Sequence, residues 1–161
     1  MRRTWTSKLT PGNKVPTFDT LTTDGTEINP SVLLGKNYIL LFYNHDGSET
    51  CTKEVCNIRD NFKILKKLGY DVFGVSEDSM QKHTKFISKY QLPFPLISDK
   101  GNLLAKTFDI YGSKDFMGRT SDAVHRTTFV INEKGIIVSI IHPVDSTNHT
   151  YQILHSLNIE V

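Results

Sequence analysis

The chain has 161 residues, of which 38% are apolar and 22% charged, and its formal net charge is +2. These values are typical of one soluble domain, which at this length buries roughly 70% of the surface of the unfolded chain. No cluster of Lys and Arg dominates the sequence, so nucleic-acid binding is not indicated. No apolar run approaches the ~18 residues that a membrane helix needs.

We therefore interpret residues 1–161 as a single domain, with residues 1–12 as an N-terminal arm. The arm has no apolar segment of the kind found in a secretory signal, although its basic, acid-poor composition leaves a short organelle-targeting signal open. With only two cysteines the chain is no disulfide scaffold, and the composition favours a cytoplasmic protein, where paired thiols are more often catalytic than structural.

Strand and helix patterns alternate along the chain. Alternating or continuous apolar residues predict strands or extended segments at residues 15–21, 38–43, 71–76, 92–98, 126–132 and 136–142. Apolar residues that recur every three or four positions predict helices at residues 51–68, 79–90, 103–108 and 147–157. Turn signals at Asp24-Gly25 and at residues 133–135 predict a β-hairpin near each end of the chain.

Two βα units followed by an antiparallel hairpin predict an α/β fold. Its central sheet is expected to be mixed, with helices on both faces and an N-terminal β-hairpin beside it. A thioredoxin-like arrangement fits this order best, and a flavodoxin-like sheet is the competing arrangement.

The two cysteines, Cys51 and Cys56, lie five residues apart on one predicted helix. Cys51 comes at the helix N-terminus, where backbone N–H groups and the helix dipole favour a thiolate. Helical geometry separates the two Cα atoms by about 8.6 Å. A disulfide needs less than ~7 Å, so it can form only if the start of the helix unwinds.

Spacing alone leaves several interpretations of this pair open. Cys51 could simply fill the apolar face of the helix as a small buried residue. A zinc site is disfavoured because there is no second cysteine pair and the histidines are scattered. A dithiol exchanger of the CxxC type is disfavoured because four residues, not two, separate the thiols. His83, on the inner face of helix 79–90, is expected to be a core residue rather than a ligand or base.

The segments around the pair resemble the peroxiredoxins, and most closely their Q-type branch, the bacterioferritin-comigratory proteins. The resemblance covers about residues 9–158. It rests on ordered matches at residues 14–18, 35–43, 51–60, 74–76, 92–99, 116–120 and 125–131.

By this resemblance the chain is a thiol peroxidase with a thioredoxin-like fold that uses no cofactor and no metal. Cys51 corresponds to the peroxidatic cysteine and Cys56 to the resolving one. Ser48 fills the hydroxyl position of the family's Pro-x-x-x-Thr/Ser-x-x-Cys signature, and Arg126 is its distant arginine. Asn44 departs from the family, because it stands where a proline normally shields the thiolate from solvent.

The resemblance also implies a reaction cycle. A helix N-terminus stabilises a thiolate by ~2 kcal/mol at most, so we expect the Arg126 guanidinium to supply the remaining stabilisation and to polarise the peroxide. Ser48 would orient the peroxide. Cys51 would become a sulfenic acid that Cys56 converts to an intramolecular disulfide, and a thioredoxin-like protein would reduce that disulfide.

The expected substrates are hydrogen peroxide and organic hydroperoxides, and the expected state is a monomer that needs neither nucleic acid nor a membrane. Two other functions remain open. One is a peroxide sensor or binding protein on a peroxiredoxin scaffold with weak turnover. The other is a general thiol-disulfide oxidoreductase, which the CxxxxC spacing disfavours.

Overall fold

The computed structural model describes residues 7–160. Its central sheet has five strands in the order β5-β4-β3-β8-β9. Strand β3 (Asn37–Phe42) runs parallel to β4 (Tyr70–Ser76), which runs parallel to β5 (Leu96–Ser98). On its other side β3 is antiparallel to β8 (Thr127–Ile131), and β8 pairs antiparallel with β9 (Ile137–Ile141). The mixed α/β sheet of a thioredoxin-like fold is thus confirmed.

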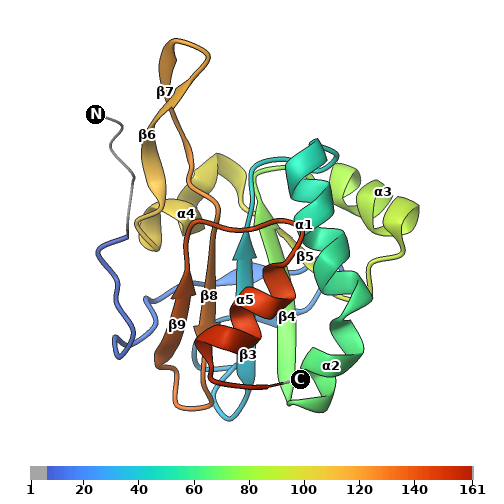
Figure 1. Cartoon of the computed structure of the whole chain (residues 1–161), viewed down its shortest axis with the longest axis vertical. Helices are drawn as coiled ribbons and strands as arrows, with labels where there is room; N and C mark the ends of the chain where they lie inside the picture. Colours follow the sequence, from blue (N-terminus) through green and yellow to red (C-terminus); the bar gives the residue numbers. More distant parts are fainter. Residues whose placement is uncertain (1–6, 161) are drawn as a thin grey trace.

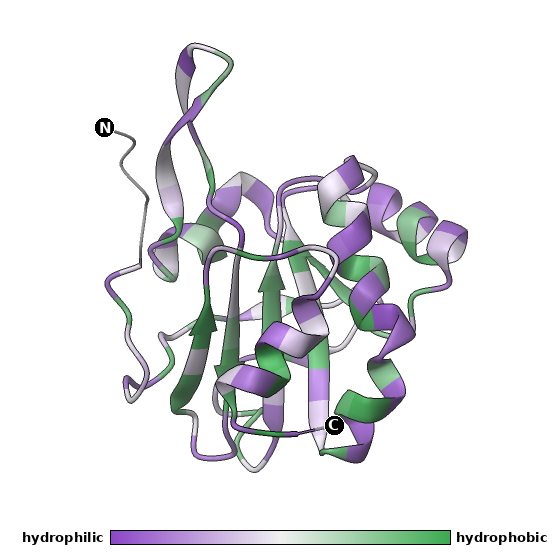
Figure 2. Ribbon diagram, in the orientation of Figure 1, coloured by the Kyte–Doolittle hydropathy of each residue, from purple (hydrophilic) through white to green (hydrophobic). Residues whose placement is uncertain are grey.

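Helices α1 (Glu49–Asp60), α2 (Phe62–Lys67), α3 (Met80–Tyr90) and α5 (His149–Ser156) pack on one face of the sheet (Figure 1). Their apolar side chains meet those of Ile39, Leu41, Val72, Leu96, Val130 and Ile141. Figure 2 shows the same division, with apolar strands at the centre and helices that alternate between polar and apolar residues. The buried sheet face explains why the β3 segment is almost continuously apolar.

The other face of the sheet is covered mainly by the N-terminal segment and by α4 (Leu103–Thr107), which follows the short 3₁₀ helix η1 (Lys100–Asn102). The expected N-terminal hairpin is present as β1 (Thr20–Leu21) and β2 (Glu27–Ile28). Residues 1–6 of the predicted arm lie outside the described residues. Within residues 7–12, Gly12 N donates to Ile137 O at 2.7 Å and Ser7 Oγ to Phe108 O at 2.7 Å.

The prediction of one continuous helix over residues 51–68 is wrong, because the structure has two helices there. The helix ends at Asp60, and α2 begins at Phe62. Between them Asn61 has φ −113° and ψ 13°, and its side-chain amide donates to Asn57 O at 2.8 Å. An asparagine side chain that bonds the backbone in this way competes with helix continuation, which accounts for the break.

A second difference is a β-hairpin that the sequence patterns did not predict. Strands β6 (Tyr111–Phe116) and β7 (Arg119–Val124) pair only with each other and project away from the sheet (Figure 1). Their connecting residues, Met117 and Gly118, have φ of +51° and +79°, as a two-residue hairpin turn requires. Most residues of the hairpin are exposed, so its strands lack the polar–apolar alternation that marks a half-buried strand.

None of the helices within residues 7–160 is long and apolar enough to cross a membrane.

Close packing between β4 and β5 predicts the effect of one substitution. Gly74 pairs with Leu96, and a Cβ atom at Gly74 would lie 2.5 Å from Leu96 Cδ2 and 3.3 Å from Tyr43 Cε1. We expect Gly74→Ala to lower the free energy of unfolding by about 1–3 kcal/mol, because Leu96 is fully buried and has little room to move. Urea denaturation measures this loss.

The matched control is the same substitution in a Leu96→Ala background. There the clash with Leu96 is absent and only the milder contact with Tyr43 remains, so Gly74→Ala should cost less than it does alone. An equal cost in both backgrounds would show that contact with Leu96 is not the cause.

Candidate active site

Cys51 lies in the first turn of α1, immediately beyond the loop that follows β3. Its side chain is only 2% exposed and packs in the apolar cluster between the helices and the sheet. Ser48 is the N-cap residue of α1, and within the described residues its hydroxyl makes no capping hydrogen bond. The backbone thus places both residues at the positive end of the helix dipole, as the spacing predicted. Cys51 is buried although Asn44 occupies the signature's proline position.

Cys56 lies on the same uninterrupted helix but is half-buried, whereas Cys51 is fully buried. Both thiols are free. Partial burial raises the pKa of the Cys56 thiol, the positive charge of Arg59 lowers it, and Asp60 raises it further. Because the helix is continuous from Glu49 to Asp60, it holds the two cysteines too far apart for a disulfide.

Arg126, at the connection between β7 and β8, reaches the helix through Glu54. One of its terminal guanidinium nitrogens lies 3.1 Å from Glu54 Oε1. Glu54 follows Cys51 by three residues, so the two side chains lie one turn apart on the same side of α1. The long-range contact therefore brings the predicted arginine to the turn of the helix that carries Cys51. The carboxyl group that holds it was not predicted to be part of the site.

Lys114 is a second cation at this site, and the sequence analysis did not identify it. It lies on β6, opposite Ser121, and is half-buried although most of the hairpin is exposed. Burial lowers the pKa of Lys114, and the positive charge of Arg126 lowers it further, whereas negative charge at Cys51 raises it. Lys114 is thus close enough to both Arg126 and Cys51 to interact with their charges. Since the projecting hairpin supplies Lys114, no local pattern around the cysteines could have indicated it.

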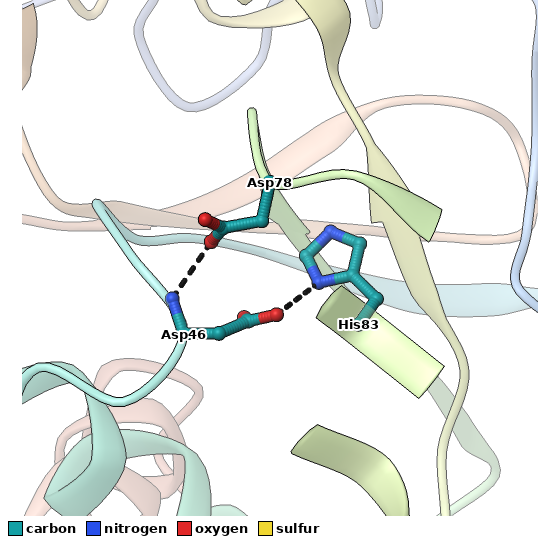
Figure 3. Close-up of side chains that lie close together, drawn as sticks. All are labelled: Asp46, Asp78 and His83. Carbon is teal, nitrogen blue, oxygen red and sulfur yellow. Dashed lines mark hydrogen bonds and ion pairs between the residues drawn. The ribbon is translucent and has the colours of Figure 1, made fainter. Parts of the chain in front are cut away.

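The loop between β3 and α1 is fixed by a buried network of polar groups (Figure 3). Asp46 accepts from Tyr43 Oη at 2.5 Å, its second carboxylate oxygen lies 2.6 Å from His83 Nδ1, and its backbone N–H donates to Asp78 at 2.7 Å. His83 Nε2 lies 3.0 Å from Ile97 O. His83 is fully buried, in agreement with its predicted place in the core.

Ligand atoms of Asp46, Asp78 and His83 lie within 4.8 Å of one another, a spacing that a cation could use. Each of these side chains already has hydrogen-bond partners in the protein, and Lys82 Nζ lies 2.8 Å from Asp78 Oδ1. The cluster is therefore satisfied by protein groups and holds the loop that leads to Ser48.

On the far side of the cysteines, Asn57 attaches α1 to the segment that leads into α5. Its side-chain amide donates to Thr147 O at 2.9 Å, and its side-chain oxygen accepts from Thr150 N and Thr150 Oγ1, both at 2.8 Å. Asn57 directly follows Cys56. The two ends of the cysteine-bearing segment are thus fixed by hydrogen bonds that involve neither thiol.

His149 lies at the start of α5 and is fully buried. Its Nε2 lies 2.7 Å from Thr128 Oγ1 and its Nδ1 lies 2.9 Å from Gln152 Oε1. Burial lowers the pKa of His149 to about 4, and the positive charge of Arg126 contributes to the lowering. His149 is therefore neutral at physiological pH. Its hydrogen bonds connect α5 to Thr128 on β8 without adding charge to the site.

The loop network predicts a large effect of Asp46→Ala. The substitution leaves His83 buried with Nδ1 unpaired and releases the loop, so we expect the free energy of unfolding to fall by about 3 kcal/mol. His45→Ala is the control, because His45 is exposed in the same loop and lies 4.0 Å from Asp78; it should change stability by no more than about 0.5 kcal/mol. Equal effects of the two substitutions in urea denaturation would contradict this account of the loop.

The buried neutral histidine predicts a specific acid sensitivity. Since the pKa of His149 in the folded state lies below the ordinary value of 6.5, its contribution to stability is complete above pH 6.5 and is lost as the pH falls towards 4. Between pH 7 and pH 4 the wild type should lose about 3 kcal/mol more than His149→Gln. Identical pH profiles of the unfolding free energy would show that His149 does not titrate in this way.

Comparisons with known proteins identify the family of the chain. The AhpC/TSA family model matches residues 11–140. The chain is 37% identical over 146 residues to a protein of Coxiella burnetii called putative peroxiredoxin bcp, covering 91% of this chain and 97% of the relative. It is 34% identical over 149 residues to peroxiredoxin Bcp of Escherichia coli, covering 92% and 96%.

Among solved structures, the bacterioferritin comigratory protein of Xanthomonas campestris superimposes with a TM-score of 0.82 at 25% identity, covering 95% of this chain and 98% of that one. The structure of that protein was determined in connection with its alkyl peroxide reduction activity. The site has a buried cysteine at a helix start, a second cysteine on the same helix and an arginine brought to the first turns of that helix. The chain belongs to the AhpC/TSA family, as a peroxiredoxin of the Bcp type.

Proposed function

We propose that this peroxiredoxin, a thiol-dependent peroxidase, uses Cys51 as its peroxide-reactive thiol and Cys56 as the thiol that resolves the product. The observation that carries the assignment is the placement of Cys51 in the first turn of α1, one turn from the carboxyl group that holds Arg126. Helix dipole and guanidinium both stabilise a thiolate at that point. Cys56 lies further along the helix, away from its N-terminus, which supports its assignment as the second thiol.

The reaction starts with attack of the Cys51 thiolate on one oxygen of the peroxide. A sulfur–oxygen bond forms, the oxygen–oxygen bond breaks, and the departing oxygen takes a proton to leave as water or alcohol. Arg126 stabilises the negative charge on that oxygen, and the Ser48 hydroxyl, which is not used in a helix cap, orients the peroxide. Lys114 adds positive charge to the same region.

Resolution requires the first turns of α1 to unwind, because the intact helix keeps the thiols apart. The Cys56 thiolate then attacks the sulfur of the Cys51 sulfenic acid. The disulfide forms, the sulfur–oxygen bond breaks, and the departing hydroxide takes a proton from solvent to leave as water. A thioredoxin-like dithiol returns both cysteines to the reduced state by exchange. We propose hydrogen peroxide and organic hydroperoxides as substrates; the alkyl peroxide reduction of the Xanthomonas campestris relative supports the second class.

Because both thiols belong to one chain, no partner subunit is needed for resolution, and we propose that a monomer is the working unit. The two-cysteine composition and the redox cycle fit a cytoplasmic location.

Steady-state peroxide consumption with a thioredoxin-type donor tests these roles. Cys51→Ser should lower the rate to background, because no other thiolate occupies the helix start. Cys56→Ser should consume one equivalent of peroxide and then turn over at least tenfold more slowly than the wild type, since its sulfenic acid lacks the intramolecular partner. Wild-type turnover by Cys51→Ser would overturn the assignment of the peroxide-reactive thiol; wild-type turnover by Cys56→Ser would overturn that of the resolving thiol.

A further inference from the structure

Glu54 is a buried carboxyl group placed between the two cysteines. It follows Cys51 by three residues and precedes Cys56 by two, and its side chain is 0% exposed. Oε1 accepts the hydrogen bond from Arg126. Oε2 is buried and has no hydrogen-bond partner among residues 7–160. The folded helix therefore carries a carboxyl group with only half of its polar surface satisfied.

Such a group is costly to ionise where it lies. Burial raises the pKa of Glu54 from an ordinary 4.5 to about 8, and the charge and hydrogen bond of Arg126 offset only part of this rise. In water the same carboxyl group would ionise near its ordinary value. At any pH between about 4.5 and about 8, a motion that exposes Glu54 therefore releases a proton to solvent.

The charged and titratable groups around this contact come from several elements. Cys51 shares α1 with Glu54, and Lys114 on β6 acts on both Arg126 and Cys51. His149 on α5 interacts with Arg126, and His142, just past β9, contacts the backbone oxygen of Arg126 at 3.0 Å. These groups act around Arg126, and Oε2 receives a hydrogen bond from none of them.

Disulfide formation needs this same segment of α1 to unwind, and unwinding carries Glu54 out of its buried position. We propose that Glu54 is a proton-controlled trigger of α1 unwinding, which favours the intact, peroxide-reactive helix when protonated and the unwound, resolving segment when ionised. The inference rests on the proposed roles of Cys51 and Cys56. No bond other than the oxygen–hydrogen bond of the carboxyl group breaks in the switch, and the proton goes to solvent.

The sign of the pH dependence follows from the two states. The folded segment holds more protons than the unwound one, so rising pH favours unwinding between about pH 4.5 and about pH 8. Within that window one released proton changes the unwinding equilibrium by up to about tenfold per pH unit. Above it the effect levels off.

Hydrogen exchange measures the unwinding directly. The background is Cys51→Ser/Cys56→Ser, in which neither thiol titrates and no disulfide forms. After correction for intrinsic exchange rates, the opening constant of amides in residues 51–56 should rise with pH by up to about tenfold per unit. The rise should be absent in Glu54→Gln. Glu49→Gln is the matched control, because Glu49 lies on the same helix with a side chain 84% exposed and should retain the rise.

If the opening constant of Cys51→Ser/Cys56→Ser, which retains Glu54, did not depend on pH, the proposal would be overturned even if Glu54→Gln failed to fold. An equal rise in Glu54→Gln would overturn it too. Because this experiment uses neither peroxide nor a free thiol, its outcome is independent of whether the assigned peroxidase roles are right.

A kinetic experiment tests the same trigger in the working enzyme. The resolving step requires the Cys56 thiolate. In the unwound segment this thiol is exposed and has the ordinary cysteine pKa of about 8.5, so its ionisation alone gives about tenfold per pH unit below about pH 7.5. With Glu54 the resolution rate should rise by up to about 100-fold per unit, and with Glu54→Gln by about tenfold. Equal slopes for the two proteins in single-turnover measurements between pH 5.5 and 7.5 would contradict a role for Glu54 in resolution.

Discussion

Two thiols five residues apart on an intact α-helix are separated by about 8.6 Å between Cα atoms, farther than a disulfide can span. With the proposed roles of Cys51 and Cys56, this distance divides the catalytic cycle into two structural states. The peroxide-reactive state needs α1 intact, because the helix start supplies dipole and burial to Cys51. The resolving state needs the same turns to open. The rest of the site must stabilise the first state without preventing the second.

The fixed points on either side of α1 show how this requirement is met. Hydrogen bonds among Asp46, His83 and Asp78 hold the loop before the helix. Asn57, the residue after Cys56, is hydrogen-bonded to Thr147 and Thr150, which fixes the other end of the segment. The turns between these points are held by apolar burial and by the contact of Glu54 with Arg126. Unwinding can therefore be confined to a short segment while the sheet and the remaining helices keep their packing.

In the proposed mechanism the Arg126 guanidinium, which is hydrogen-bonded to Glu54, also stabilises a Cys51 thiolate, so the two anions would compete for one positive charge. When Cys51 is a thiolate, a protonated Glu54 leaves the positive charge to the sulfur. Once the sulfur has become an uncharged sulfenic acid, that competition ends, but the Glu54 carboxylate still has one oxygen without a partner among the described residues. Ionisation of Glu54 then favours the unwound segment, in which water can solvate both carboxylate oxygens.

The elements closest to the chemistry could be predicted from sequence because their signals are local. The apolar run of β3, the three-and-four spacing of α1 and the Ser48-to-Cys51 interval each identify their element. Asn61 could not be recognised as a helix end, since its apolar neighbours continue the helical pattern. The β6–β7 hairpin was missed because both faces are exposed, and with it Lys114. Glu54 was missed as a site residue because its significance depends on the long-range contact to Arg126.

The most direct test is oxidation of the reduced protein by one equivalent of hydrogen peroxide. Stopped-flow measurement gives the rate of oxidation, and mass spectrometry identifies the product. We expect fast loss of both thiols and a mass decrease of two hydrogens, located by peptide mapping to a Cys51–Cys56 bond. Oxidation no faster than that of free cysteine, or a product that keeps the Cys56 thiol free, would contradict this expectation.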